Sequence, residues 1–175
     1  MPQSNDQITQ LPNYQIPVTV AVALGSNLGD RRAHLDYAAA RLRELFDGVR
    51  VSAYHETAPV DVAGEQPDFL NAAAVGATTL AARDVLAALL AIEQERGRAR
   101  PFPAAARTLD LDLVLFGTRI IDEPPELIVP HPRFRDRLFV LDPLAEIAPD
   151  LLDPVTGRTV DELRRMASLN STHTG

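Results

Sequence analysis

The amino-acid sequence predicts an α+β fold in which helices pack on an antiparallel sheet. Two observations support this: short β-branched, apolar runs of strand length, and two longer segments whose apolar residues recur at helical spacing. The hydrophobic and charged fractions of the 175 residues, 46% and 23%, are those of an ordinary globular protein. We therefore expect one folded unit with a contiguous core.

The first half of the chain predicts a strand, a helix and two further strands. Residues 18–24 are apolar and β-branched and are followed by Gly-Ser-Asn, which is typical of a buried strand that ends in a turn. Over 30–46 the apolar residues recur at helical spacing, and Asp30 can cap the start of that helix. Residues 49–57 and 69–79 are expected to be extended, on either side of a loop rich in proline, glycine and acidic residues.

A second helix and a fourth strand complete this core. The helical pattern repeats over 80–96 and stops at Gly97, and residues 108–116 follow as a strand. The resulting order, β-α-β-β-α-β, is that of a ferredoxin-like fold, in which helices pack on one face of an antiparallel sheet. The proline-rich segments 124–132 and 143–154 are expected to wrap this core with additional short strands and helices.

The two ends of the chain differ from its centre in composition. Thr159 is expected to cap a last helix that ends at Met166. The polar segments 1–17 and 167–175 cannot bury enough apolar surface to offset the entropy of ordering, so we expect both to be flexible. A single domain over 18–166 remains between them.

Composition also excludes several classes of protein. No run approaches the roughly 18 apolar residues that cross a membrane, and the N-terminal segment lacks an apolar signal-peptide core, so the predicted location is the cytoplasm. There are no cysteines, so any metal must be bound by oxygen or imidazole ligands. The net charge of -7 and pI of about 5.0 argue against a nucleic-acid surface, although RNA-recognition domains share this element order. Local basic clusters can still bind a small anion.

The most informative stretch is residues 107–116, Arg-Thr-Leu-Asp-Leu-Asp-Leu-Val-Leu-Phe. Because side chains alternate along a strand, Asp110 and Asp112 are expected side by side on one face. The other face is expected to be buried through Leu109, Leu111, Leu113 and Leu115. Adjacent carboxylates repel unless a cation neutralises them, and their hard oxygens suit Mg²⁺ carried in with a nucleotide. The pattern alone fits the polar outer face of a half-solvated strand equally well.

A basic segment, residues 96–107, leads directly into the two carboxylates. Arginine guanidinium groups bind phosphate oxygens, so Arg107 beside a metal-binding pair points to a polyphosphate ligand. Arg96 and Arg98 are also explained by the C-terminal dipole of the preceding helix. No Walker phosphate loop occurs, so a nucleotide would be held by another scheme.

Two further motifs have a functional and a structural interpretation. His131 lies between two prolines and ahead of three arginines, and a histidine in that setting is more often a turn residue than a catalyst. Residues 25–30, Gly-Ser-Asn-Leu-Gly-Asp, are similar to a phosphate-binding turn at a helix start, but a turn with an N-cap explains them as well. We interpret residues 25–30 as structural.

Four ordered motifs together resemble the 6-hydroxymethyl-7,8-dihydropterin pyrophosphokinase family. They are Val-Ala-Leu-Gly-Ser-Asn-Leu-Gly-Asp at 22–30, Pro-Asp-Phe-Leu-Asn-Ala at 67–72, Arg-Thr-Leu-Asp-Leu-Asp at 107–112 and Val-Pro-His-Pro-Arg at 129–133. The resemblance implies a ferredoxin-like core and transfer of diphosphate from ATP to the hydroxymethyl group of a reduced pterin. AMP is released, and the product enters folate biosynthesis.

The resemblance also implies a role for individual residues. Asp110 and Asp112 match the carboxylates that hold two Mg²⁺ ions on the ATP phosphates. The catalytic positions are Arg98, Arg100, Arg107, Asp110 and Asp112, and the ATP-binding positions are Glu93, Arg98, Arg107, His131 and Arg137. The pterin-binding positions are Thr57, Ala58, Val60, Phe69, Asn71 and Phe139. Aromatic rings can sandwich a flat heterocycle and an amide can bind its polar edge, whereas plain core packing also accounts for Phe69 and Phe139.

The sequence departs from the commonest family pattern just before the carboxylates. Residues 104–106 are alanines where a Trp-Gly-Pro element often stands, and Phe102 could cover the pterin instead. A homologue that binds its ligands without turnover is the alternative, but both aspartates are kept. We expect a monomer, with a weak dimer as the alternative. The expected partners are two small-molecule substrates, with no nucleic acid and no membrane, and the general base is left unassigned.

Overall fold

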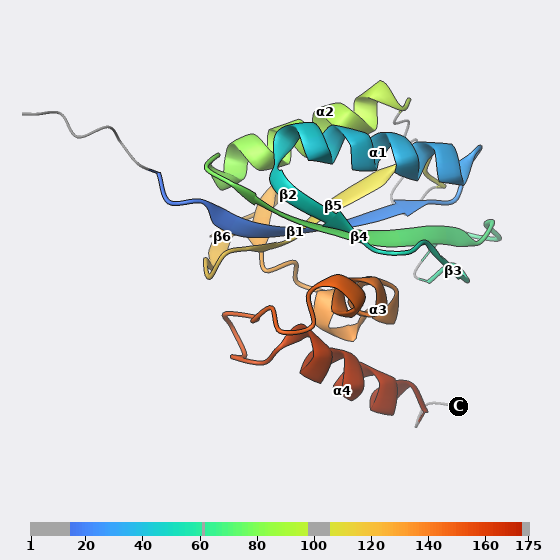
Figure 1. Cartoon of the computed structure of the whole chain (residues 1–175). Helices are drawn as coiled ribbons and strands as arrows, with labels where there is room; N and C mark the ends of the chain where they lie inside the picture. The colour runs from blue at the N-terminus through green and yellow to red at the C-terminus, as the bar shows by residue number, and fades with distance from the viewer. Residues whose placement is uncertain (1–14, 61, 98–105, 173–175) are drawn as a thin grey trace, which may run out of the picture.

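The computed structural model describes residues 15–60, 62–97 and 106–172. Its main sheet is antiparallel, with strand order β2-β4-β1-β5 and β3 paired to β4 (Figure 1). The strands are β1 (Val18–Ser26), β2 (Asp47–Val51), β3 (His55–Thr57), β4 (Phe69–Thr78) and β5 (Asp110–Phe116). This order is the predicted ferredoxin-like arrangement, with the extended segment 49–57 divided into β2 and β3.

Helices cover both faces of this sheet (Figure 1). The predicted pair, α1 (Arg31–Leu45) and α2 (Ala82–Glu95), packs on one face. The C-terminal third of the chain forms a second layer on the other face, with α3 (Leu138–Ile147) and α4 (Val160–Thr172). A small hairpin of β6 (Ile121–Glu123) and β7 (Leu127–Val129) and the 3-10 turn η1 (Phe134–Asp136) connect β5 to that layer.

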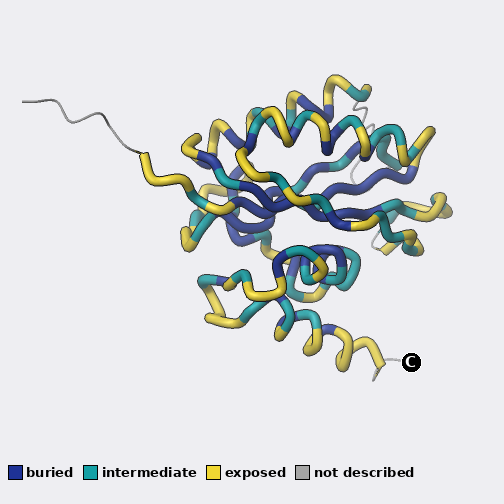
Figure 2. Tube along the Cα trace, viewed as in Figure 1, coloured by how far each residue is buried: buried dark blue, intermediate teal, exposed yellow. Residues whose placement is uncertain are grey.

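Burial on both sides explains the unbroken apolar sequence of β1. Val20, Ala21 and Val22 are each at most 1% exposed, although successive side chains point to opposite faces. The central strands of the sheet are mostly dark blue, the colour of buried residues, in Figure 2. Val22 belongs to the core under α1 and α2, and Ala21 to the core under α3 and α4. The central strand is therefore shared by two hydrophobic cores.

Both predicted helix caps are present. The side chain of Asp30 accepts a hydrogen bond from the backbone N–H of Ala33 at 3.1 Å. Thr159 and Glu162 form a reciprocal capping box, in which the Glu162 N–H donates to Thr159 Oγ1 and the Thr159 N–H donates to Glu162 Oε2. Side-chain acceptors thus fix the starts of α1 and α4.

The predicted end of the last helix at Met166 is wrong, because α4 continues to Thr172. Leu163 and Ala167 are buried on one side of α4, and the Ser171 hydroxyl donates to the carbonyl of Ala167. Polar residues therefore stay helical by bonding back to the preceding turn. Residues 167–172, the first part of the segment predicted to be flexible, lie in this helix.

Among the described residues, no helix combines the length and apolar character that a membrane crossing needs.

Candidate functional site

Asp110 and Asp112 lie on the same face of β5, next to the central strand β1. Asp110 pairs in register with Gly25 and Asp112 with Ala23, and both carboxylates line one cavity. Leu111, between them, is buried on the α1–α2 side of the sheet. The strand geometry therefore brings the two carboxylates together as the alternation predicts.

The predicted burial of four leucines on one face of β5 is wrong for Leu115. The pairing with β1 passes from Val22 opposite Leu113 to Ala21 opposite Leu115, so Val114 is an extra residue in β5. This β-bulge reverses the alternation, and Leu115 packs with the core under α3 and α4. The bulge lies beyond Asp112 and leaves the face of the carboxylates unchanged.

The carboxylate pair carries an electrostatic cost that Arg107 partly offsets. Burial, together with the charges of Asp110 and Glu93, raises the pKa of Asp112 to about 7 against the opposing effect of Arg107. Arg107 Nη1 lies 2.6 Å from Asp110 Oδ2. The Arg107 guanidinium thus places a positive charge directly beside the carboxylate pair.

A cavity of about 460 Å³ lies against β1, β3, β4, β5 and α3, and these carboxylates form part of its wall. It is lined by every residue that the resemblance assigned to the pterin: Thr57, Ala58, Val60, Phe69, Asn71 and Phe139. Arg107 and Arg137 line the same cavity. The fold therefore brings the expected pterin residues and two of the expected ATP-binding residues into one space, whereas His131 does not line the cavity.

The polar side chain at the cavity floor is Asn71 in β4. It is 5% exposed, and its Nδ2 donates to Thr57 Oγ1 at 2.6 Å across the β3–β4 pair. The amide is therefore held in a fixed orientation, with its carbonyl oxygen toward Gly25. A Cβ added at Gly25 would lie 3.3 Å from Asn71 Oδ1 and 3.6 Å from Phe69 Cδ1.

Sequence reasoning missed several residues that line the cavity, and Gly25 is the most informative of them. It is the last residue but one of β1, not part of the turn that the sequence predicted. A glycine inside a strand often marks a site where another group approaches closely, and that signal was available. Arg133, Val62 and Val140 also line the cavity, although none of them was predicted as a site residue.

His131 and Arg137 flank the turn η1. Arg137 lines the cavity, with its guanidinium carbon 5.4 Å from the centroid of the Phe139 ring. Burial, together with the positive charges of Arg137 and Arg133, lowers the pKa of His131 to about 4 despite the opposing charge of Asp110. His131 is therefore neutral at pH 7. Its Nδ1 accepts from the backbone N–H of Arg133 at 3.2 Å, which places the ring proton on Nε2.

Glu93 is placed differently from the other expected nucleotide residues. It is 2% exposed on α2, does not line the cavity, and its Oε1 accepts from the Leu111 N–H at 2.8 Å. The carboxylate therefore supports the backbone of β5 between the two aspartates.

Asn27 joins three segments around the site, although its motif was interpreted only as a capped turn. It is 1% exposed, and its Oδ1 accepts from the Arg107 N–H at 2.8 Å while its own N–H donates to the Arg107 carbonyl at 3.0 Å. Its Nδ2 donates to Gln66 Oε1 at 2.9 Å. Asn27 therefore fixes the backbone of Arg107 where the chain enters β5.

Some predicted residues cannot be placed. Arg98, Arg100 and Phe102 lie outside the described residues. Within the described part of the chain, no group of three or more histidine and acidic side chains is arranged to hold a metal ion, so Asp110 and Asp112 are a two-carboxylate site.

Comparison with known proteins extends these observations. A family model described as 7,8-dihydro-6-hydroxymethylpterin-pyrophosphokinase matches residues 21–149. The 2-amino-4-hydroxy-6-hydroxymethyldihydropteridine pyrophosphokinase of Pseudomonas aeruginosa is 45% identical over 146 residues, covering 82% of this chain and 88% of the relative. The protein of the same name from Bacillus subtilis is 42% identical over 143 residues, covering 81% of this chain and 84% of the relative.

A solved structure supports the fold independently. The crystal structure of wild-type Plasmodium falciparum HPPK-DHPS with pterin and p-hydroxybenzoate matches with a TM-score of 0.68 at 14% identity, covering 93% of this chain and 45% of that chain. At that identity the likeness shows the fold alone. The family match and the two bacterial relatives span most of the chain, and the chain belongs to the 7,8-dihydro-6-hydroxymethylpterin-pyrophosphokinase family.

Proposed function

We propose that the cavity beside β5 binds ATP phosphates and 6-hydroxymethyl-7,8-dihydropterin together, and that the chain moves a diphosphate group from one to the other. The family to which the chain belongs performs this pyrophosphoryl transfer in folate biosynthesis. One observation carries the proposal: Asp110, Asp112 and Arg107 line the same cavity as Phe69, Asn71 and Phe139. A charged, phosphate-binding wall and an aromatic slot in one space fit a two-substrate transfer.

The pterin half of the proposal rests on ring and amide chemistry. Phe69 at the start of β4 and Phe139 in the first turn of α3 enter the cavity from different elements. We assign them to opposite faces of the flat pterin, where aromatic stacking is favourable. Asn71 Oδ1 is oriented by the bond from Nδ2 to Thr57 and accepts from the polar edge of the ring.

The donor set fits Mg²⁺. Magnesium is usually bound through one or two carboxylates together with substrate phosphates, and Asp110 and Asp112 supply two. Burial and the charge of Asp110 raise the pKa of Asp112 to about 7, and a bound cation would favour the charged form of both carboxylates. When bound, two Mg²⁺ ions would supply positive charge to the transferring phosphate group.

The chain's own residues position the substrates and stabilise the charge on the transferring phosphate group. Arg107 and Arg137 place guanidinium groups in the cavity, where they can hold phosphate oxygens against the developing charge. His131 is neutral and can donate from Nε2 to a phosphate oxygen without titrating near pH 7. The apolar wall that includes Val60, Val62 and Val140 excludes water from the reacting hydroxyl.

AMP release with magnesium titrated tests the proposal. We expect the wild-type protein to release AMP from ATP only when the pterin is present. Asp110→Ala and Asp112→Ala should each lower turnover by on the order of 100-fold or more, because each removes several kcal/mol of charge stabilisation. The double variant should lose much less than the product of the two single losses, since both residues serve the same ions.

Asp122→Ala is the matched control, because Asp122 lies exposed on β6 and does not line the cavity. It should keep wild-type turnover. Wild-type turnover in either Asp110→Ala or Asp112→Ala at ordinary magnesium would disprove the metal assignment, and AMP release without pterin would indicate a hydrolase.

A further inference from the structure

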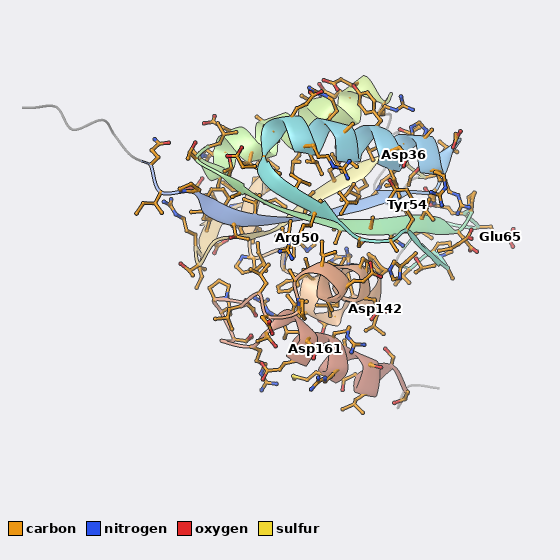
Figure 3. The ribbon with its side chains drawn as sticks, viewed as in Figure 1. Asp36, Arg50, Tyr54, Glu65, Asp142 and Asp161 are labelled. Carbon is orange, nitrogen blue, oxygen red and sulfur yellow. The ribbon has the colours of Figure 1, made fainter. Side chains whose placement is uncertain are left out.

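Polar contacts hold the C-terminal end of α3 against β2, β3 and the short segment that connects them. Glu146 Oε2 accepts from the backbone N–H of Ala53 at 2.7 Å, and Glu146 Oε1 lies 3.0 Å from His55 Nε2. Beside it, Arg50 Nη1 donates to the carbonyl of Ile147, the last residue of α3 (Arg50 is labelled in Figure 3). Neighbouring groups of one helix end therefore hold β2 and β3 through three contacts.

The same segment is anchored on its opposite side to the first helical layer. Tyr54 lies between Ala53 and His55, and its hydroxyl donates to Asp36 Oδ1 on α1 at 2.6 Å (Figure 3). The guanidinium carbon of Arg32 lies 5.1 Å from the centroid of the Tyr54 ring. Tyr54 thus ties this segment to α1, whereas Glu146 ties it to α3.

Both elements that Glu146 joins also reach the cavity. His55 and Thr57 share a face of β3, because side chains two residues apart in a strand point the same way, and Thr57 lines the cavity. Phe139 lies two helical turns before Glu146 on α3 and also lines the cavity. A residue seven positions away in a helix returns to nearly the same side, so the side of α3 that carries Phe139 also carries Glu146.

We propose that Glu146 is a positioning residue for the pterin slot: it sets the separation between the α3 wall that carries Phe139 and the β3 wall that carries Thr57. The inference rests on the proposed function of the cavity. A stacking slot is sensitive to its width, because dispersion contacts weaken sharply when a gap of 0.5–1 Å opens. The phosphate groups of ATP are bound from β5 and the η1 segment, which Glu146 does not contact.

A carboxylate suits this role because two separate groups must be held. One carboxylate oxygen accepts a hydrogen bond from the Ala53 N–H, and the other contacts the imidazole of His55. Glutamine can reproduce both contacts, since its carbonyl accepts from Ala53 and its amide donates to His55 in the other tautomer. Alanine reproduces neither. The Glu146 side chain is 41% exposed, so water can satisfy the groups that truncation releases and the fold should survive.

Direct titration of Glu146→Ala with the reduced pterin and, separately, with a nonhydrolysable ATP analogue and magnesium tests the inference. We expect pterin affinity to fall about tenfold while affinity for the ATP analogue stays within about twofold of wild type, and Glu146→Gln should restore most of the pterin affinity. The matched control is Asp142→Ala on the same helix. Asp142 is 45% exposed and faces Arg164 of α4 at 3.8 Å, so its loss should change neither affinity.

Two outcomes separate this inference from the proposed function. If the wild-type protein binds pterin and Glu146→Ala binds it equally well, the positioning role is wrong and the proposed function stands. If the wild-type protein neither binds pterin nor releases AMP, the proposed function fails and this inference fails with it. Equal loss of both affinities, or failure of Glu146→Gln to restore binding, would indicate general damage to α3 and would also overturn the role.

Discussion

Asp112 occupies a position where its negative charge is costly before any ligand arrives. Burial, with Asp110 beside it and Glu93 behind the strand, raises its pKa from 3.8 to about 7. Between those two pH values the folded protein keeps a proton that the unfolded chain releases. The stability that this proton contributes is fully present below about pH 4 and is lost as the pH rises through 7.

Replacement of this carboxylate should therefore stabilise the protein, and more so at higher pH. We expect the difference in free energy of unfolding between Asp112→Asn and wild type to widen from pH 4 to pH 7 and then level off. Urea denaturation in EDTA at several pH values measures it, with Asp122→Asn on exposed β6 as the control. A difference that stays constant over this pH range would contradict the electrostatic account.

The aromatic residues of the cavity make a separate prediction for binding. Phe139→Ala and Phe69→Ala should each weaken pterin affinity about tenfold or more, because stacking contributes about 0.5–1.5 kcal/mol beyond the area buried. Phe139→Leu keeps most of the apolar volume without the ring and should fall between wild type and Phe139→Ala. Calorimetric titration with the pterin measures all three, and unchanged affinity in both alanine variants would mean that the pterin lies elsewhere.

Among the elements, the η1 segment is held in place by a residue distant in sequence. Arg135 makes two hydrogen bonds to the carboxylate of Asp153, at 2.6 and 2.9 Å, and Asp153 is fully buried. Burial alone would raise the pKa of Asp153, but the hydrogen bonds from Arg135, Thr156 and Val155 outweigh it and lower the pKa. This pair fixes the turn between Arg133 and Arg137, both of which line the cavity.

Loss of that pair should affect both stability and nucleotide binding. Asp153→Ala leaves Arg135 without its partner, and we expect the free energy of unfolding to fall by about 3 kcal/mol, the lower end for a broken buried pair because Arg135 keeps some contact with solvent. Affinity for the ATP analogue should fall more than affinity for pterin. Asp150→Ala, in the exposed turn after α3, is the control, and equal loss of both ligands would argue against a specific effect on the turn.

The elements also show which local features a sequence can predict. Asp30 and Thr159 were identified as caps because a side-chain acceptor before an apolar helical pattern is a local signal. The bulge at Val114 could not be predicted, since it depends on how β5 pairs with β1. The end of α4 was misplaced because hydrogen bonds to the preceding turn hold its polar last turn.

At the scale of the whole molecule, the sequence predicted one helical layer and the structure has two. The sequence of strands and helices along the chain follows from the periodicity within each segment. The order in which the strands pair in the sheet follows the ferredoxin-like pattern. The α3–α4 layer was expected only as short wrapping elements. Pro143 lies inside α3, and a proline in a sequence usually argues against a continuous helix at that point. Val62 and Val140 reach the cavity through tertiary packing, which no local pattern reveals.

Ligand binding should be visible as a change in the stability of the whole chain. A ligand at 100 times its dissociation constant stabilises the folded state by about 2.7 kcal/mol. We therefore expect the ATP analogue with magnesium to raise the melting temperature of the wild-type protein, and Asp110→Ala to lose most of that increase. Thermal unfolding with and without EDTA measures it. If the increase in melting temperature does not depend on magnesium and persists in Asp110→Ala, the proposed metal site is wrong.

The central place of β1 determines when the protein can fold during synthesis. β1 is made before both of the strands that pair with it, β4 and β5, so Val20 meets Phe116 only after all the residues between them have been made. Until β4 has been made, β1 has no partner on either edge, and until β5 has been made one edge stays unpaired, which is a condition that favours aggregation. The emerging chain therefore needs protection over that interval, and the polar helix α1, made directly after β1, is the first segment able to shield it.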